Sequence, residues 1–179
     1  MEIRTSRLLL RPWKDEDLPQ IIAVNSDPDV MEFVDPTLTP EQSEAMISRA
    51  RQSWNENGFG LFAVEAPGVA DLIGFVGLAI PRFESHFTPA VEIGWRLLSP
   101  YWGHGYATEG ANAVKEFAFK NLCLEEIVSF TSAQNLRSRN VMEKIGLKRN
   151  PNDDFEHPNI SPDNPLRAHV LYRGTPNVS

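Results

Sequence analysis

Apolar and polar positions alternate along the chain in a way that predicts strands and helices in mixed order. Short apolar runs typical of strands lie at 7–11, 59–65, 72–80, 90–98, 127–131 and 167–172. Segments with apolar residues at helical spacing begin at Asp15, Thr39, Thr108 and Asn135. This order predicts one mixed sheet with helices on both faces, an arrangement that is compatible with several folds.

Four of the helix ends carry residues with specific backbone preferences. Asp15 is a candidate N-cap of the first helix, and Asn135 of the last. Thr39, followed three residues later by Gln42, has the composition of a capping box. Gly58 is suited to end the helix that Thr39 begins.

Length and composition indicate a soluble protein of one domain over 1–179, large enough to bury a core without disulfides. The only cysteine, Cys123, lies between two leucines, and we expect a buried, inert thiol. The longest apolar run, 72–80, is far shorter than the roughly 20 residues of a membrane span. With no targeting segment visible, these features predict a cytoplasmic protein that does not bind membranes.

Charge is distributed unevenly along the chain. The net charge of −7 argues against nucleic acid as a partner, because phosphate binding needs a basic face. The segment 15–48 holds nine carboxylates and neither Lys nor Arg, whereas the segment 137–149 holds five Lys or Arg residues. The first segment could attract cations and the second anions, or both could be solvated helix faces.

The most informative segment is 91–109, in which a strand meets a tight turn and then a helix. The turn reads Trp102-Gly103-His104-Gly105-Tyr106-Ala107. Backbone N–H groups in such a turn, together with the positive end of the helix, form a cradle for anions. Glycine lets the backbone approach a phosphate closely. The alternative is a glycine-rich turn that binds no ligand.

Two common nucleotide-binding loops do not match this turn. A P-loop needs Gly-Lys-Ser/Thr where this chain has Gly105, Tyr106 and Ala107. A dinucleotide-binding fingerprint needs a third Gly or Ala where this chain has Thr108. A nucleotide-binding oxidoreductase is therefore disfavoured.

The turn resembles the (Gln/Arg)-x-x-Gly-x-(Gly/Ala) motif of the GNAT acetyltransferases, in which backbone amides hold the pyrophosphate of coenzyme A. Trp102 in the first place is typical of a branch similar to the RimJ/RimL ribosomal-protein N-terminal acetyltransferases. The segments 5–11, 27–31 and 135–147 also resemble family segments: the opening strand, a turn between the first helices and a second cofactor motif. The similarity extends over about residues 3 to 149.

The resemblance implies a GNAT-like α/β domain that uses acetyl-CoA. Its central sheet would be mixed and mostly antiparallel, with a splay between strands 4 and 5, the strand ending near Leu98 and the strand 127–131. The pantetheine arm would lie in this gap and bond to main-chain groups. The implied cofactor-binding residues are Leu97, Leu98, Trp102, Gly103, His104, Gly105, Tyr106, Ala107, Thr108, Asn135, Ser138 and Arg139. Arg139 is the candidate for the phosphates of the adenosine end.

Acetyl transfer to an amine needs a base, a group that stabilises the developing oxyanion, and protonation of the leaving thiolate. Glu92 is the candidate base by family resemblance, because partial burial could raise its pKa toward neutrality. The position where many GNAT enzymes place a Tyr acid holds Met142, which we expect to pack in the core. Ser138 is therefore the candidate acid. A structural salt bridge at Glu92 and a local helix-turn bond at Ser138 are the alternatives.

We expect acetyl transfer by direct attack in a ternary complex, onto a protein N-terminus or a small amine. The alternative is a non-catalytic acyl-CoA-binding or regulatory module. Because the segment 15–48 flanks the acceptor side in the family, its carboxylates favour a cationic acceptor. Family analogy suggests a homodimer, and the four histidines and one cysteine lack metal-site spacing, so we expect no metal.

Overall fold

The computed structural model describes residues 1–34 and 38–176, and nine strands within these ranges form one sheet. The strands are β1 (Ile3–Arg4), β2 (Leu9–Arg11), β3 (Leu61–Ala66), β4 (Ala70–Ala79), β5 (Glu92–Leu97), β6 (Ile127–Ser132), β7 (Lys148–Arg149), β8 (Phe155–Glu156) and β9 (Ala168–Gly174). The helices are α1 (Leu18–Ser26), α2 (Pro28–Met31), α3 (Pro40–Asn57), α4 (Tyr106–Lys120) and α5 (Leu136–Lys144). Asp35, one of the nine carboxylates in 15–48, lies outside the described residues.

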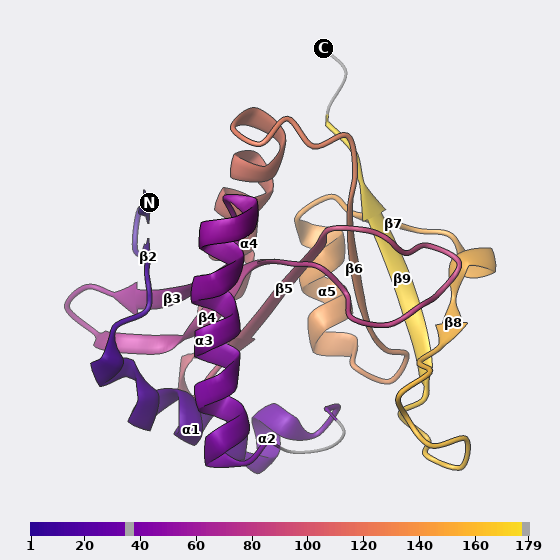
Figure 1. The fold of residues 1–179 in the computed structure, drawn as a ribbon, viewed down its shortest axis with the longest axis horizontal. Helices are drawn as coiled ribbons and strands as arrows, with labels where there is room; N and C mark the ends of the chain where they lie inside the picture. The colour runs from indigo at the N-terminus through magenta and orange to yellow at the C-terminus, as the bar shows by residue number, and fades with distance from the viewer. Residues whose placement is uncertain (35–37, 177–179) are drawn as a thin grey trace.

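The sheet has the order β1-β2-β3-β4-β5-β6-β9-β7, with β8 paired to β9 (Figure 1). Within the described ranges, β5 and β6 are the parallel neighbours and the other neighbouring pairs are antiparallel. The prediction of a mixed, mostly antiparallel sheet is therefore confirmed.

The strands β5 and β6 separate soon after they meet. Glu92 lies opposite Val128, and beyond this pair the register between the two strands ends. The Ser129 hydroxyl, rather than a backbone N–H of β6, donates to the Ile93 carbonyl at 2.8 Å. Figure 1 shows β5 running away from β6. The splay expected between the fourth and fifth strands is present, and it opens at Glu92.

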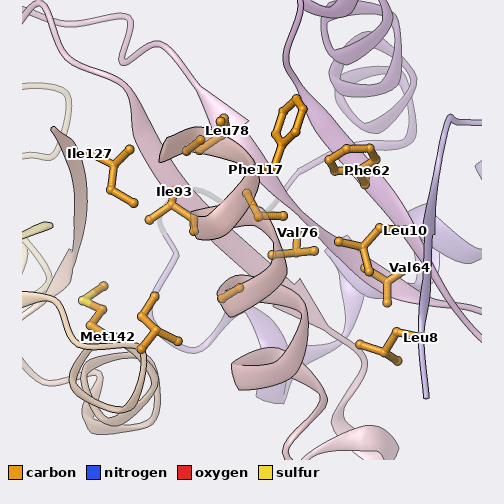
Figure 2. Close-up of a cluster of buried hydrophobic side chains, with 14 of the residues drawn as sticks. Leu8, Leu10, Phe62, Val64, Val76, Leu78, Ile93, Phe117, Ile127 and Met142 are labelled. Atoms are coloured by element: carbon orange, nitrogen blue, oxygen red, sulfur yellow. The ribbon is translucent and has the colours of Figure 1, made fainter. Parts of the chain in front are cut away.

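Helices cover both faces of the sheet, as the sequence predicted (Figure 1). On one face, buried residues of α1 and α3 such as Ile21 and Ile47 pack with Phe75 of β4. On the other face, α4 and α5 pack against the main core, where Figure 2 shows Ile93 and Met142. The prediction that Met142 packs in the core is confirmed, since it is 2% exposed. No helix in 1–34 or 38–176 is long and apolar enough to cross a membrane.

The capping box of α3 forms as predicted. The Thr39 hydroxyl accepts from the Gln42 N–H at 3.2 Å, and the Gln42 side chain accepts from the Thr39 N–H at 2.8 Å. Gly58 ends the helix in the left-handed conformation, with φ of 72°. These bonds satisfy backbone groups that a helix end leaves unpaired, so a local sequence pattern was sufficient to predict them.

Other element boundaries differ from the sequence predictions. Asp15 does not cap an α-helix; it starts a 3-10 turn, and α1 begins at Leu18 because Asp17 is held by Arg11 through two bonds of 2.8 and 2.9 Å. The expected turn at 27–31 contains the short helix α2, capped by the Asp27 carboxylate. The helix expected from Thr108 begins two residues earlier, directly after Gly105.

Cys123 is exposed, so the prediction of a buried thiol was wrong. Its backbone is left-handed, with φ of 53°, at the turn that follows α4. The neighbouring Leu122 and Leu124 pack against the core instead, and the residue between them is directed to solvent. The flanking leucines therefore misled the prediction because this segment is neither a strand nor a helix.

A separate aromatic cluster lies on β6 and β9, where the segment 80–91 crosses them. Phe83 and Phe87 of this segment contact Phe130 of β6, with ring centroids 5.6 and 5.7 Å apart, and both contact Phe155. His169 of β9 lies among these rings and is 8% exposed. Its burial lowers the pKa of His169 from 6.5 to about 4.

Buried His169 should make the protein less stable in mild acid. The unfolded chain binds a proton there with the ordinary pKa of 6.5, whereas the folded protein does not until about pH 4. The stability that the folded protein gains from a neutral His169 is therefore fully present above pH 6.5 and is lost as the pH falls toward 4. Between pH 7 and pH 5 the free energy of unfolding should decrease by about 2 kcal/mol for this reason. In His169→Phe, the free energy of unfolding should decrease between pH 7 and pH 5 by about 2 kcal/mol less than in the wild type. Urea unfolding at both pH values measures this difference. Equal losses in wild type and variant would contradict this assignment.

Candidate active site

The glycine turn after β5 has the geometry of an anion cradle. Gly103 and Gly105 have left-handed backbones, with φ of 78° and 81°. Gly105 is the N-cap of α4 and supplies no side-chain bond to the first turn. The first helical bond runs from the Glu109 N–H to the Gly105 carbonyl at 3.0 Å. The N–H groups that precede Glu109 in the helix are therefore available to an external anion.

Two charged residues anchor this cradle to the N-terminal strands. Arg7 donates to the His104 carbonyl at 2.8 Å and pairs with Glu109 at 2.7 Å. Thr5 donates to the same Glu109 carboxylate at 2.6 Å. Sequence reasoning matched the segments that contain these residues to family motifs without giving them a site role. The sequence signal that could have identified them is Glu109, a carboxylate in the first turn of the helix after the glycines whose partner has to come from another part of the chain.

A cavity of about 550 Å³ extends from the cradle into the gap between β5 and β6. Ten residues that the sequence predicted line it: Glu92, Leu97, Trp102, Gly103, Gly105, Tyr106, Ala107, Thr108, Asn135 and Ser138. Three predicted residues do not: Leu98, His104 and Arg139. His104 is exposed and contributes its backbone to the turn.

The edge of β5 offers different main-chain groups from those expected. The Leu98 N–H donates to the Ile73 carbonyl at 2.9 Å, and the Leu97 carbonyl accepts from the Trp102 indole at 2.8 Å. Because backbone groups alternate in direction along a strand, Trp95 directs its N–H and carbonyl toward β6, beyond the last paired residue. Trp95 lines the cavity and is the main-chain position that sequence reasoning missed.

Asn135 and Ser138 form one bonded unit at the start of α5. The Asn135 side-chain oxygen accepts from the Ser138 N–H at 3.2 Å and so caps the helix. The Asn135 amide donates to the Ser138 hydroxyl at 3.2 Å and to the Thr131 hydroxyl at 3.0 Å. With its oxygen accepting this bond, the Ser138 hydroxyl can donate its own proton into the cavity.

Arg137 of α5 lines the cavity, whereas Arg139, the candidate for the phosphates of the adenosine end, does not. Arg139 turns away from the cavity and donates to the Ala133 carbonyl at 2.9 Å. The Arg137 guanidinium lies 4.3 Å from the centre of the Trp102 ring and pairs with Glu32 at 2.8 Å. Arg137 therefore connects the cofactor turn to the segment after α2.

Glu92 lies where the two strands separate and lines the cavity. Burial raises the pKa of Glu92 to about 8, and the positive charge of Arg96 opposes this rise. At pH 7 roughly one-tenth of the molecules carry such a group in its ionised form, which can accept a proton more readily than an ordinary carboxylate. Glu92 is therefore a carboxyl on the cavity wall that exchanges its proton near neutral pH.

Among the described residues, none of the carboxylates of 15–48 lines the cavity. Cavity-lining residues of this segment are Val30, Phe33 and Val34. Several carboxylates have partners elsewhere: Asp15 pairs with Arg51 at 2.7 Å, Asp17 with Arg11 at 2.8 Å, Glu32 with Arg137 at 2.8 Å, and Asp27 accepts from Ser99 at 2.8 Å. The segment does flank the cavity, but it contributes apolar side chains to the lining.

The residues present fit a coenzyme A thioester. The cradle provides N–H groups without side chains in the way, which suits a pyrophosphate. The gap provides free strand backbone at Trp95, which suits an amide-containing arm. Ser138 and Asn135 lie along the same cavity as Glu92, so the two ends of the reaction share one space.

Comparisons with known proteins agree with this site. A family model described as acetyltransferase (GNAT) domain matches residues 7–148. YnaD of Bacillus subtilis, an uncharacterized N-acetyltransferase, is 31% identical over 150 residues, which cover 83% of this chain and 84% of that protein. An acetyltransferase of Agrobacterium tumefaciens superposes with a TM-score of 0.78 at 27% identity, covering 97% of this chain and 94% of that one.

RimL, a ribosomal L7/L12 α-N-protein acetyltransferase solved with coenzyme A, superposes with a TM-score of 0.78 at 11% identity over 98% of both chains. At this identity the likeness concerns the fold alone. The family match and the 31% identical relative carry the assignment, since each covers most of the chain. The chain belongs to the GNAT acetyltransferase family and is an acetyl-CoA-dependent N-acetyltransferase.

Proposed function

We propose that a primary amine attacks the acetyl group directly, with Glu92 accepting the amine proton and Ser138 donating to the leaving sulfur. The observation that carries this proposal is the place of Glu92, in the gap between β5 and β6, with a pKa raised by burial. A base with a pKa near 8 accepts a proton effectively while remaining partly ionised at neutral pH. A direct attack also gains from the orientation of both reactants in one cavity.

The donor side is supported by the cradle and by α5. Acetyl-CoA supplies the acetyl group as a thioester, and the N–H groups at the start of α4 are suited to its pyrophosphate. Free N–H groups on the β5 edge could stabilise the negative charge that develops on the acetyl oxygen. The tyrosine that many members of the family use as the acid is absent here. The Ser138 hydroxyl, which Asn135 holds in place, is the hydroxyl donor that could take its role.

The sheet supports a single domain that extends over 1–179. The family match ends at residue 148, yet β9 lies between β6 and β7 in the same sheet. Removing β9 would expose the buried edge of β6, so the segment after 148 belongs to the same folding unit. Cytoplasmic location and a homodimer remain predictions.

The alternative that the sequence left open, a non-catalytic acyl-CoA-binding module, is disfavoured by the family match and by the N-acetyltransferase relative. It would not need a carboxyl with a raised pKa in the gap, or a hydroxyl held by Asn135 in the same cavity. A broad amine panel with acetyl-CoA, followed by the release of free thiol, tests the proposal. Turnover with at least one amine supports catalysis, whereas tight acetyl-CoA binding without turnover on any amine would favour the binding module.

Binding of acetyl-CoA should depend on the backbone of Gly105. An alanine there keeps an ordinary contact, because its Cβ would meet Arg7 at 3.5 Å, but it occupies the space where a phosphate approaches the cradle. We expect Gly105→Ala to weaken acetyl-CoA binding about tenfold or more, measured by calorimetry.

Gly68 is the matched control for this change. It has φ of 80°, close to the 81° of Gly105, and a Cβ there meets nothing within 4 Å. Gly68→Ala therefore costs the same left-handed strain, of about 1–2 kcal/mol, without a cofactor contact. Equal acetyl-CoA affinity in the two variants would show that Gly105 does not approach the cofactor.

A further inference from the structure

The wall of the cavity also holds an arginine, Arg96, to which the proposed transfer reaction assigns no role. Arg96 lies on β5 and lines the cavity together with Gly94 and Glu92. Side chains four residues apart in a strand point to the same face, so Arg96 and Glu92 face one space across the bare backbone of Gly94.

A buried polar network holds Arg96 in this position. Arg96 Nη1 donates to the Asn25 side-chain oxygen at 2.7 Å. Asn25 in turn donates to the Ser43 hydroxyl at 3.0 Å, and Ser43 donates to the Thr39 carbonyl at 3.0 Å. Asn25 and Ser43 are both 0% exposed. Burying two polar side chains is costly unless they serve a purpose, and here they orient a single guanidinium.

The remaining face of the guanidinium is left for another group. Its carbon lies 5.4 Å from the centre of the Phe75 ring, which packs beneath it. Within 1–34 and 38–176, Arg96 forms no ion pair, and the bond to Asn25 uses one of its five N–H donors. A guanidinium with free donors on the wall of a cavity is suited to a carboxylate, which it can bind through two parallel bonds.

The charged residues that line the cavity also favour an anionic group on the acceptor. Described cavity residues that are formally charged are the cations Arg96, Arg137 and Lys144 and the carboxylate Glu92. Arg137 pairs with Glu32, and Lys144 lies at the end of α5, on the donor side. Arg96 is the cation on the same strand face as the base, so an anionic group of the acceptor would find its partner there.

The space above Gly94 on β5 is open, because a Cβ built there would meet nothing within 4 Å except the Glu92 carboxylate, at 3.7 Å. Glu92 and Arg96 line the cavity on either side of this residue. They do not form an ion pair with each other, so a gap separates them. The surrounding wall is apolar, formed by Val30, Phe33, Val34, Leu61, Phe75 and Phe130.

We propose that the acceptor is an amino acid with an apolar side chain, whose carboxylate is bound by Arg96 while its amine faces Glu92. This assignment rests on the proposed function and names its substrate class. It replaces the cationic acceptor expected from the acidic segment, because the described lining offers a cation where that expectation needed carboxylates.

The reaction then balances as a simple acyl transfer. The neutral amine nitrogen forms a bond to the acetyl carbon, and the carbon–sulfur bond breaks. The amine proton passes to Glu92, and the sulfur leaves with a proton from Ser138 or from water. The proton on Glu92 returns through solvent to the group that protonated the sulfur, so no net proton is gained or lost by the protein. The products are an N-acetylamino acid and free coenzyme A, and neither an oxidant nor a metal is consumed.

Three amines with the same apolar group test the proposal: phenylalanine, phenylalanine amide and phenylethylamine. The assay follows release of coenzyme A. Each kcat/KM value is divided by the fraction of the amine that is unprotonated at the pH of the assay, so that differences in amine pKa do not enter the comparison. A carboxylate bound by a guanidinium should favour phenylalanine over the other two by about tenfold to a hundredfold. Equal values for all three would overturn the proposal and leave the proposed function intact.

Two substitutions separate the charge of Arg96 from its packing. Arg96→Met keeps a long apolar side chain, and Asn25→Asp keeps Arg96 in place but gives it a carboxylate partner. Both should reduce the preference for phenylalanine to about threefold or less, since each removes a free positive charge. Asn25→Asp tests the proposal even if Arg96→Met fails to fold.

Arg137→Met is the matched control, because Arg137 is another arginine of the same cavity. It should leave the ratio between phenylalanine and phenylethylamine unchanged, whatever it does to acetyl-CoA binding. Loss of the preference in Arg137→Met alone would assign the carboxylate to Arg137 and overturn the role of Arg96. No turnover with any amine in a broad panel would instead count against the proposed function.

Discussion

Replacing Glu92 with glutamine is expected to lower kcat at pH 7 by about 10²–10⁴-fold, the usual range for a general base. The change keeps the size of the side chain and removes only its ability to accept a proton. Glutamine should not disturb packing, because the carboxyl of the wild type is already largely neutral at pH 7. Acetyl-CoA affinity is therefore expected to stay within about threefold of wild type, measured by calorimetry.

The pH dependence of this variant identifies the group. With a pKa of about 8, Glu92 becomes ionised as the pH rises, so kcat/KM of the wild type should rise up to about pH 8. The acceptor amine adds a second rising limb of its own as it loses its proton. In Glu92→Gln the first limb should disappear while the limb of the amine remains. A profile with both limbs intact would assign the base to another residue.

Stability provides an independent check on the same pKa. A carboxyl with a raised pKa keeps its proton in the folded protein, whereas the unfolded chain loses it near 4.5. The contribution of Glu92 to the free energy of unfolding should therefore decrease as the pH rises from 4.5 to 8, opposite in sign to the contribution of His169. Glu92→Gln carries no such charge, so its advantage over the wild type should grow across this interval. Equal slopes would show that Glu92 is not buried in a dry environment.

The parts of the fold that sequence reasoning predicted are those in which the deciding contacts are local. The capping box of α3 needs only residues three apart, Thr39 and Gln42. The cradle needs two glycines followed by a helix, since left-handed turns favour glycine wherever they occur. Both could be predicted from a few consecutive residues because the backbone geometry is specified within them.

The choice between Arg137 and Arg139 depended on contacts that are distant in sequence. Two residues along a helix are rotated by about 200°, so one faces the cavity and the other faces β9. Arg139 reaches the Tyr172 hydroxyl at 3.4 Å, thirty-three positions away, and Arg137 reaches Glu32. The first turn of α5 has no continuous apolar stripe, so the sequence gives no indication of which side faces inward.

The Arg96 network was also hidden from sequence reasoning. Asn25 and Arg96 are separated by 71 positions, and each has an unremarkable neighbourhood. Only the packing of α1 on β4 and β5 brings them together. The nine carboxylates of 15–48 dominated the prediction for the acceptor side, although the described ones are mostly paired or turned to solvent.

Filling the space above Gly94 should abolish acetyl transfer without unfolding the protein. Gly94 lies between Glu92 and Arg96 on β5, and a Cβ there would meet only the Glu92 carboxylate, at 3.7 Å. Gly94→Val adds three carbons to the floor of the cavity, where the amine approaches the base. We expect kcat/KM for the amine to fall about a hundredfold or more, because small displacements of a reacting group have effects of that size. The Tm should not fall, since valine suits a strand better than glycine.

Gly77 lies opposite Gly94 on β4 and provides a control for the expected loss of turnover in Gly94→Val. A Cβ at Gly77 would lie 2.4 Å from the Gly60 carbonyl oxygen, so the backbone itself would have to move. Gly77→Val should therefore lower the Tm, whereas Gly94→Val should lower turnover and leave the melting transition and acetyl-CoA affinity in place. The difference arises because one glycine faces packed backbone and the other faces open space beside the base. A Gly94→Val enzyme with wild-type kcat/KM for its best amine would show that the acceptor does not pass between Glu92 and Arg96.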